Sequence, residues 1–189
     1  MSADAQFART LERLLKQSKR ILLTLTTGLD GDSLGSLLAM EHVVRHYGKT
    51  CFCYSPEAVP PMFDYLMGNR RLMREMADTV HDFDLIIVFD TGDINRSPLA
   101  DELIKRDPAR TVVVNIDHHP TTIIHLGQSA VDHNHVDTGA SSTTQIIHRL
   151  IQELRIPMNR HLATSLLTGL VTDTGNFSNL GTTQEAVAI

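Results

Sequence analysis

The sequence has few cysteines, no long apolar run and no excess of basic side chains. Its two cysteines, Cys51 and Cys53, are two apart on an expected strand, so both point to one face and a disulfide between them is disfavoured. No apolar run approaches the roughly 20 residues of a membrane-spanning helix, and no secretory leader pattern opens the chain. We therefore expect a cytoplasmic protein with no membrane association. The net charge of −5 leaves no broad basic surface for a polyanion, so any phosphate ligand must be bound locally.

Short repeats, low-complexity tracts and Pro-rich linkers are also missing from the sequence. The 189 residues, of which 42% are hydrophobic, are enough for one domain with a substantial core. We therefore expect residues 1–189 to form a single domain. The stretch from Thr182 to Ile189 has the pattern of a helix N-cap followed by the first turns of a helix that then stops, which indicates a truncated chain.

Apolar runs with strand character alternate with stretches of helical periodicity along the chain. This alternation predicts an α/β fold, a parallel, doubly wound sheet with helices on both faces. The expected strands are Ile21–Leu25, Lys49–Tyr54, Leu85–Phe89 and Thr111–Ile116, and the expected helices are Asp4–Lys19, a stretch after Ser33, one or two short helices within Pro60–Met76, and Pro98–Lys105, Ser141–Leu154 and Arg160–Val171.

Acidic residues and histidines directly follow the expected strands. Ligands of an open parallel sheet bind beyond the carboxyl ends of its strands, so these positions are the natural place for a site. Each cluster alone is explained as a turn or a helix cap, but four such clusters at these positions favour a shared function. The residues are Asp30 and Asp32, then Asp90, then Asp117, His118 and His119, and finally Asp173 after an apolar helix.

Carboxylates that converge without nearby Lys or Arg repel one another, and a bound cation is the ordinary remedy. A mixture of oxygen ligands with imidazole favours Mn²⁺, with Mg²⁺, Fe²⁺ or Co²⁺ as alternatives. Two metals about 3.5–4 Å apart produce hydroxide near neutral pH and stabilise both oxygens in the displacement at a phosphate ester. The pattern therefore predicts hydrolysis of phosphate esters or anhydrides.

Four motifs of this sequence together resemble those of the DHH phosphoesterases. They are Leu29–Ser36, Asp90-Thr91-Gly92, Asp117-His118-His119-Pro120 and Thr172–Phe177, and they span nearly the whole chain. That family includes RecJ-type exonucleases, oligoribonuclease/phosphoadenosine phosphatases, cyclic-dinucleotide phosphodiesterases and manganese inorganic pyrophosphatases. The third motif, with Ala140–Thr144 after it, is most similar in style to the oligoribonuclease branch.

The resemblance implies a role for each site residue. Asp90 would bridge two Mn²⁺ ions, Asp30 would hold the first, and Asp117 and His119 would be catalytic, Asp117 by supporting the site and His119 by binding the scissile phosphate or assisting proton transfer. The ligands of the second ion would be Asp32, His118 and Asp173.

The resemblance also implies a substrate. The chain would be a manganese-dependent phosphoesterase acting on short oligonucleotides or phosphoadenosine nucleotides, with cyclic dinucleotides or inorganic pyrophosphate as alternatives. The helix-rich surface is compatible with a homodimer.

Two departures from the family pattern affect this expectation. Thr26 stands where the family usually has a histidine ligand of the first metal, and a neutral hydroxyl is a poor replacement for imidazole. The first metal site is then weak, water-filled or empty, and a catalytically degenerate, metal-binding regulatory domain is the alternative reading. The second departure is that the smaller substrate-binding domain, with its Gly-rich motif, does not follow the metal-binding domain.

Two further clusters are not assigned to the site. Asp132–His135 is interpreted as a surface loop whose histidines bind metal only adventitiously. Arg70 and Arg71 are interpreted as part of a solvated helical face.

Overall fold

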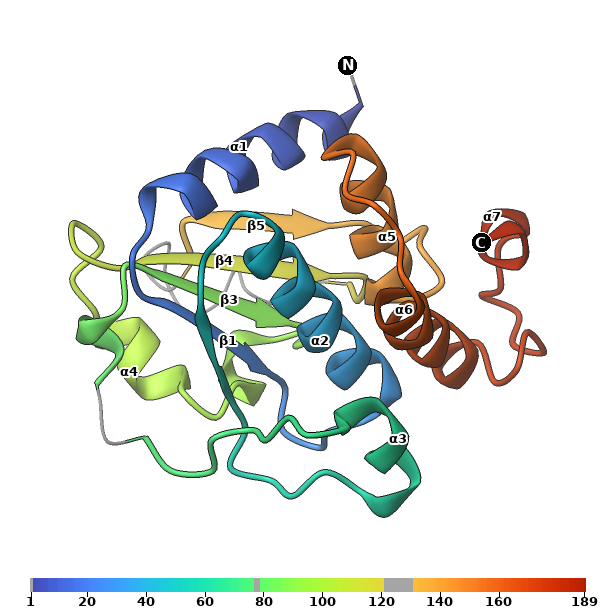
Figure 1. The fold of residues 1–189 in the computed structure, drawn as a ribbon, viewed down its shortest axis with the longest axis horizontal. Helices are drawn as coiled ribbons and strands as arrows, with labels where there is room; N and C mark the ends of the chain where they lie inside the picture. The colour runs from blue at the N-terminus through green and yellow to red at the C-terminus, as the bar shows by residue number, and fades with distance from the viewer. Residues whose placement is uncertain (1, 77–78, 121–130) are drawn as a thin grey trace.

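A computed structural model describes residues 2–76, 79–120 and 131–189 of the chain. Its centre is one sheet of five strands, and every neighbouring pair of strands is parallel. The predicted α/β fold with a parallel sheet is therefore confirmed (Figure 1). The strands are β1 (Ile21–Leu25), β2 (Cys51–Tyr54), β3 (Leu85–Phe89), β4 (Val112–Asp117) and β5 (His133–Val136).

Helices cover both faces of the sheet, and the thicker layer is the one in front in Figure 1. None of the helices in the described part of the chain is both long and apolar enough to cross a bilayer. The front layer holds α1 (Ala3–Gln17), α2 (Gly31–His46), α5 (Thr143–Glu153) and α6 (Arg160–Asp173). The other face is covered by α4 (Ala100–Lys105) and the 3-10 turns η2 (Val80–Asp82) and η3 (Ile94–Arg96). Outside the two layers lie α3 (Asp64–Met67), which η1 (Pro61–Phe63) precedes, and α7 (Gln184–Ala188).

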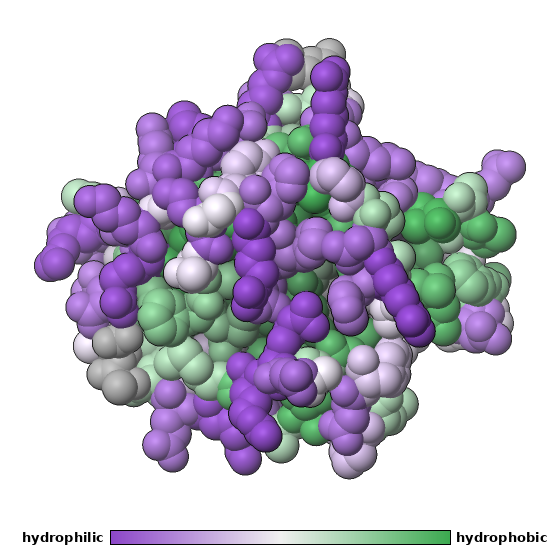
Figure 2. Space-filling view, viewed as in Figure 1, coloured by the Kyte–Doolittle hydropathy of each residue, from purple (hydrophilic) through white to green (hydrophobic). Residues whose placement is uncertain are grey.

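The central strand β3 is apolar and buried at every position because both of its faces are covered. Successive residues of β3 alternate between two cores, so that Ile87 packs with the front layer while Ile86 packs with Leu103 of α4. A separate group of exposed apolar side chains gathers over α7, at the right in Figure 2, and includes Val187 and Ile189.

Strand β5 was not predicted, and the interpretation of Asp132–His135 as a surface loop is wrong. The segment pairs with β4, and the side chain of His135 is 8% exposed. Its Nε2 lies 2.8 Å from Oδ1 of Asp4, and its ring stacks on Phe7. The buried imidazole of His135 is stable in this strand because Asp4 of α1 gives it a hydrogen-bond partner, whereas Asn134 of the same strand is exposed.

The one or two short helices predicted within Pro60–Met76 are present as η1 and α3. Only Pro61–Met67 is helical, and Met73 forms an isolated parallel bridge with Tyr54. Arg70 and Arg71 lie after α3 in irregular chain, so the interpretation of a helical face is wrong here as well.

The order of the strands, β2-β1-β3-β4-β5, reverses direction beside β1. In open α/β sheets a crevice forms at such a switch point, outside the carboxyl ends of the two strands on either side of it. Here these strands are β1 and β3, and the segments that follow them carry Asp30 and Asp90.

Helices α2 and α6 cross closely at glycines. A Cβ atom at Gly35 would lie 2.5 Å from the backbone oxygen of Ser165, and one at Gly31 would lie 2.4 Å from Oγ1 of Thr172. Only the absence of a side chain allows this approach. The crossing brings the first turn of α2 beside the last turn of α6, and so places Asp32 near Asp173.

Candidate metal centre

Asp32 is held by the N-terminus of α5. Its carboxylate is 1% exposed and accepts hydrogen bonds from the backbone N–H of Thr143 (2.6 Å), the backbone N–H of Thr144 (3.0 Å) and the Thr144 hydroxyl (2.8 Å). A helix N-terminus favours a negative charge. Burial nevertheless raises the pKa of Asp32 to about 6, and the nearby His118 only partly opposes this rise.

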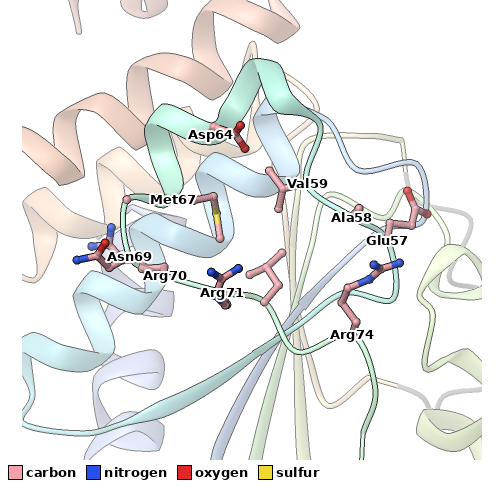
Figure 3. Close-up of a pocket in the computed structure, with 11 residues that line it drawn as sticks. Glu57, Ala58, Val59, Asp64, Met67, Asn69, Arg70, Arg71 and Arg74 are labelled. Atoms are coloured by element: carbon pink, nitrogen blue, oxygen red, sulfur yellow. The ribbon is translucent and has the colours of Figure 1, made fainter.

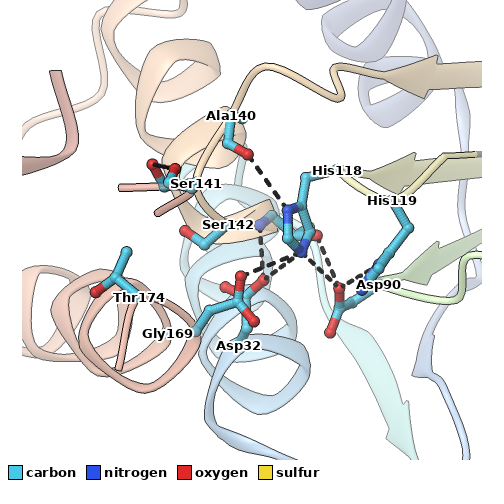
Figure 4. A network of polar contacts seen from close by, with 12 residues as sticks. Asp32, Asp90, His118, His119, Ala140, Ser141, Ser142, Gly169 and Thr174 are labelled. Atoms are coloured by element: carbon cyan, nitrogen blue, oxygen red, sulfur yellow. Dashed lines mark hydrogen bonds and ion pairs between the residues drawn. The ribbon is translucent and has the colours of Figure 1, made fainter. Parts of the chain in front are cut away.

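His118 has a ring nitrogen that no described hydrogen-bonding group satisfies. Its Nδ1 lies 3.3 Å from the carbonyl oxygen of Ala140, which can only accept, so in the neutral ring Nδ1 bears the proton and the lone pair is on Nε2. This buried Nε2 has no hydrogen-bond partner among the described residues. It lies 3.3 Å from Oδ2 of Asp173, 3.7 Å from Oδ1 of Asp90 and 3.9 Å from Oδ2 of Asp32 (Figure 4).

A cation fits this arrangement. The ligand atoms of Asp32, His118 and Asp173 all lie within 4.8 Å of one another, as do those of Asp90, His118 and His119. A cation between them would satisfy the lone pair of His118 and relieve the repulsion among the carboxylates. The carboxylate oxygens and the unpaired imidazole nitrogen are therefore ligands of the kind that a transition metal binds.

Asp90, directly after β3, belongs to one of the two ligand groups, and His118 is common to both. The backbone of Asp90 has a φ of 58°, a left-handed conformation that is strained in a residue other than glycine and is concentrated at functional sites. Its Oδ1 accepts a hydrogen bond of 3.1 Å from the hydroxyl of Thr143. Burial, followed by the charge of Asp32, raises the pKa of Asp90 to about 8.

Asp117, at the end of β4, fixes His119. Its Oδ1 accepts hydrogen bonds from the backbone N–H of His119 (3.0 Å) and from Nδ1 of the same residue (2.9 Å), and its Oδ2 accepts one from the N–H of Gly92. Burial opposes the charge of Asp117, but these hydrogen bonds outweigh it and lower its pKa. The bond to Asp117, and then the nearby Asp90, raise the pKa of His119 to about 10.

Thr26 and Asp30, the two residues expected at the first metal, form hydrogen bonds with residues close to them in the chain. The buried hydroxyl of Thr26 donates to the backbone oxygen of Thr27 at 3.2 Å. The exposed Asp30 caps α2, and its Oδ1 accepts a bond of 2.9 Å from the N–H of Ser33. Asp30 belongs to neither of the two ligand groups that the described residues form.

A cavity of about 500 Å³ opens beside the two histidines. Its wall includes His118, His119, Asp173, Ser141 and Asn179. Imidazole rings and small polar side chains therefore line the space through which a ligand would reach the cluster.

Three of the contacts that build the cluster are not evident in the sequence. Thr143 and Thr144 begin a helix, and their pattern indicates only an N-cap, whereas in the structure they bind Asp90 and Asp32. Gly169 lies in the middle of α6, and a Cβ atom there would be 2.6 Å from Oδ1 of Asp32. A glycine within a helix, four residues before Asp173, is the signal that points to a close approach at this position.

The fold and the cluster together define a class, the α/β domains that gather Asp and His side chains at the switch point of a parallel sheet. The chain belongs to the DHH family: the profile of the DHH family, N-terminal domain, matches residues 20–170. The predicted family is therefore confirmed.

Known proteins of similar sequence or structure agree with this family. The chain is 28% identical over 161 residues to the bifunctional oligoribonuclease and PAP phosphatase NrnA of Thermus thermophilus, covering 85% of this chain and 45% of that protein. An exopolyphosphatase-related protein from Bacteroides fragilis has the same fold, with a TM-score of 0.81, 21% identity, and coverage of 97% of this chain and 54% of the other. RecJ from Thermus thermophilus, solved in complex with Mn²⁺, gives a TM-score of 0.53 at 18% identity, over 90% of this chain and 24% of RecJ. The chain spans about half the length of the curated relatives it matches.

Proposed function

We propose that this chain is the metal-binding catalytic domain of a manganese-dependent phosphoesterase. Its substrates are the phosphodiester or phosphomonoester bonds of short oligonucleotides or phosphoadenosine nucleotides. The observation that supports this most directly is the buried, unpaired Nε2 of His118 among three carboxylates. The Mn²⁺ in the RecJ structure supports the choice of metal, and the name of the Thermus NrnA supports the substrate class.

The proposed ligands form two overlapping sets. Asp32, His118 and Asp173 would hold one ion, Asp30 would hold the other, and Asp90 would contribute to both. Once bound, the ions supply a hydroxide near neutral pH and stabilise negative charge on the phosphate. The N-terminus of α5 keeps the carboxylate of Asp32 in place through the Thr143 and Thr144 amides.

His119 binds the phosphate group in this proposal. The hydrogen bond from its Nδ1 to Asp117 raises the pKa of the ring and favours the protonated form. The Nε2–H is then left to donate a hydrogen bond to a phosphate oxygen in the adjoining cavity, or to give a proton to the leaving oxygen. Asp117 is the positioning residue that sets the orientation of the ring.

The test is hydrolysis of a dinucleotide by the whole gene product after Mn²⁺ loading. We expect about two Mn²⁺ ions per chain and release of mononucleotides that EDTA abolishes. Asp90→Asn should remove this activity, whereas Asp101→Asn, on exposed α4, should retain it. One bound ion with no turnover would contradict the proposal.

The geometry at Thr26 supports a second candidate, a regulatory domain that binds metal without catalysis. The Thr26 hydroxyl is engaged by a neighbouring carbonyl, and Asp30 by its own helix. A single Mn²⁺ that stabilises the fold without hydrolysing any nucleotide would favour this candidate. A homodimer and a cytoplasmic location stay predictions.

A further inference from the structure

A second cavity of about 500 Å³ lies beside the loop that follows β2 (Figure 3). It lies outside the acidic cluster, and its wall contains none of the proposed metal ligands. The wall combines basic, acidic and apolar side chains, contributed by Glu57, Val59, Asp64, Met67, Asn69, Arg70, Arg71, Leu72 and Arg74.

Two of the charged groups of this wall already have partners. The guanidinium of Arg70 lies 2.9 Å from Oε2 of Glu41. The two carboxylate oxygens of Glu57 accept hydrogen bonds from the backbone N–H of Gly28 (2.7 Å) and of Leu29 (3.2 Å). The negative charge of Glu57 is therefore stabilised by the loop between β1 and α2, and it is only partly available to a cation in the cavity.

Arg71 and Arg74 are exposed, and neither forms an ion pair with a carboxylate of residues 2–76, 79–120 or 131–189. The guanidinium of Arg74 makes only long contacts, of 3.4 Å, to the backbone oxygen of Pro56. In Figure 3 the guanidinium of Arg71 lies near Val59 and Met67, and that of Arg74 is turned toward Glu57. Two guanidinium groups thus face one cavity of a protein whose net charge is −5.

We propose that this cavity binds a phosphate group of the substrate, at least one nucleotide away from the bond that is cut. The proposal rests on the proposed function, since it takes the ligand to be an oligonucleotide. Guanidinium groups bind phosphate through paired, charge-assisted hydrogen bonds. Val59, Met67 and Leu72 in the same wall offer an apolar surface to the base or ribose.

Glu57 connects this cavity to the metal centre. Its side chain lines the cavity and also binds the amides of Gly28 and Leu29, directly before Asp30. The cavity is therefore adjacent to the loop that leads into the first motif. A single-stranded nucleotide chain with one phosphate at the cluster can extend along this loop toward Arg71 and Arg74.

The first test measures binding without catalysis. The whole chain, kept metal-free with EDTA, is titrated with a fluorescent five-nucleotide oligothymidylate at several salt concentrations. Arg71→Gln and Arg74→Gln should each weaken binding about tenfold, and should each reduce the slope of log K against log salt by about 0.7. Arg13→Gln, which removes an exposed charge from α1, should have little effect on either quantity.

Thermal melting checks that each variant is folded, and Arg71→Lys, which keeps the charge, should restore most of the salt dependence. Equal affinities and slopes for Arg71→Gln, Arg74→Gln and Arg13→Gln would overturn the proposal. Because this measurement needs no turnover, its result does not depend on whether the proposed hydrolysis occurs.

The second test asks whether the phosphate belongs to the substrate or to a separate oligonucleotide. With Mn²⁺ present, Arg71→Gln should raise the KM for the oligonucleotide about tenfold and leave the KM for a nitrophenyl ester of a single nucleotide unchanged. An unchanged KM for both substrates, together with weakened binding in EDTA, would show that the cavity binds an oligonucleotide other than the one that is cut and would overturn the assignment to the substrate. Absence of any turnover would contradict the proposed function but not the binding result.

Discussion

The two sides of the acidic cluster differ in what already holds their side chains. On the Asp32 side, the carboxylate of Asp32 is fixed by the start of α5, and His118 presents a lone pair to three carboxylates. On the Thr26 side, the hydroxyl of Thr26 bonds to the next carbonyl, and Asp30 caps its own helix. One side is therefore preorganised for a cation, whereas the other must rearrange to bind one.

The difference indicates that the two proposed metal sites are not equivalent. A ligand set that is fixed before the ion arrives loses little conformational entropy on binding, so the Asp32 side should fill first. The Thr26 side should fill at a higher Mn²⁺ concentration. The following predictions test this inequality, from the largest expected effect to the smallest.

Removing the central ligand should abolish the stronger side. His118→Ala deletes the only imidazole of the group formed by Asp32, His118 and Asp173. It should lower the affinity for the first Mn²⁺ to bind by at least about 100-fold, because changes to residues that merely support a ligand already lower metal affinity by about 10–100-fold. Isothermal titration with Mn²⁺ measures the effect. His161→Ala, on the exposed surface of α6, is the matched control. If the two variants bind Mn²⁺ alike, His118 is not a ligand.

Supplying an imidazole should strengthen the weaker side. Thr26→His replaces a hydroxyl by a nitrogen ligand, and should raise the affinity for the Mn²⁺ that binds second, at the Thr26 side, by at least about tenfold. The adjacent, exposed Thr27→His keeps the composition the same and should not change the second affinity. Metal content after dialysis at graded Mn²⁺ concentrations distinguishes the two variants. An unchanged stoichiometry in Thr26→His would show that position 26 does not face the site.

Disturbing the crossing of α2 and α6 should damage the Asp32 side and spare the Thr26 side. A Cβ atom at Gly169 would lie 2.4 Å from Thr144 and 2.6 Å from Oδ1 of Asp32. Gly169→Ala should therefore lower the free energy of unfolding by about 1–3 kcal/mol. Chemical denaturation measures this change. Gly181→Ala, where no atom lies within 4 Å of an added Cβ, should be close to neutral. Equal stabilities would mean that the helices separate readily.

The metal-free protein should lose stability between pH 7 and 8.5. Burial raises the pKa of Asp90 to about 8, and the bond to Asp117 raises that of His119 to about 10. A raised pKa means that the folded state holds protons that the unfolded chain has released, so stability falls as pH rises through this range, by up to about 1.4 kcal/mol per pH unit for each proton.

Urea denaturation in EDTA at several pH values measures this slope. Asp90→Asn should reduce this slope to the part that His119 contributes, and saturating Mn²⁺ should remove the part due to Asp90 because the ion replaces its proton. A slope that persists unchanged in Asp90→Asn would assign the titration to other groups.

The covered strands, and the position of the Asp and His side chains at the sheet edge, were predictable from local pattern. Leu85–Phe89 is apolar throughout because it is buried on both faces, and the Asp and His residues that follow such strands point to a site at the sheet edge. β5 was not predictable in this way. Its residues are polar, and it is stabilised by pairing with β4 and by the contact of His135 with Asp4, far away in sequence.

The arrangement within the cluster also depends on contacts that no local pattern contains. That Asp32 accepts bonds from Thr143 and Thr144, and that Gly169 leaves room for its carboxylate, follow from how α2, α5 and α6 pack. The same is true of Asp30, whose sequence context fits both a ligand and a cap. Motif spacing predicted which residues are present at the site, whereas tertiary packing determines which of them are preorganised.

The distribution of the cluster along the chain has a consequence for synthesis on the ribosome. Asp32 emerges early, but the helix that holds it begins at Thr143, and its neighbour Asp173 ends α6. At about 5–20 residues per second, the early carboxylates wait several seconds before their partners exist. A nascent chain therefore offers a cation no complete set of the Asp32 ligands until α6 has left the exit tunnel, so an ion at this set would bind only after the whole sheet and the helices α1 to α6 have been synthesised.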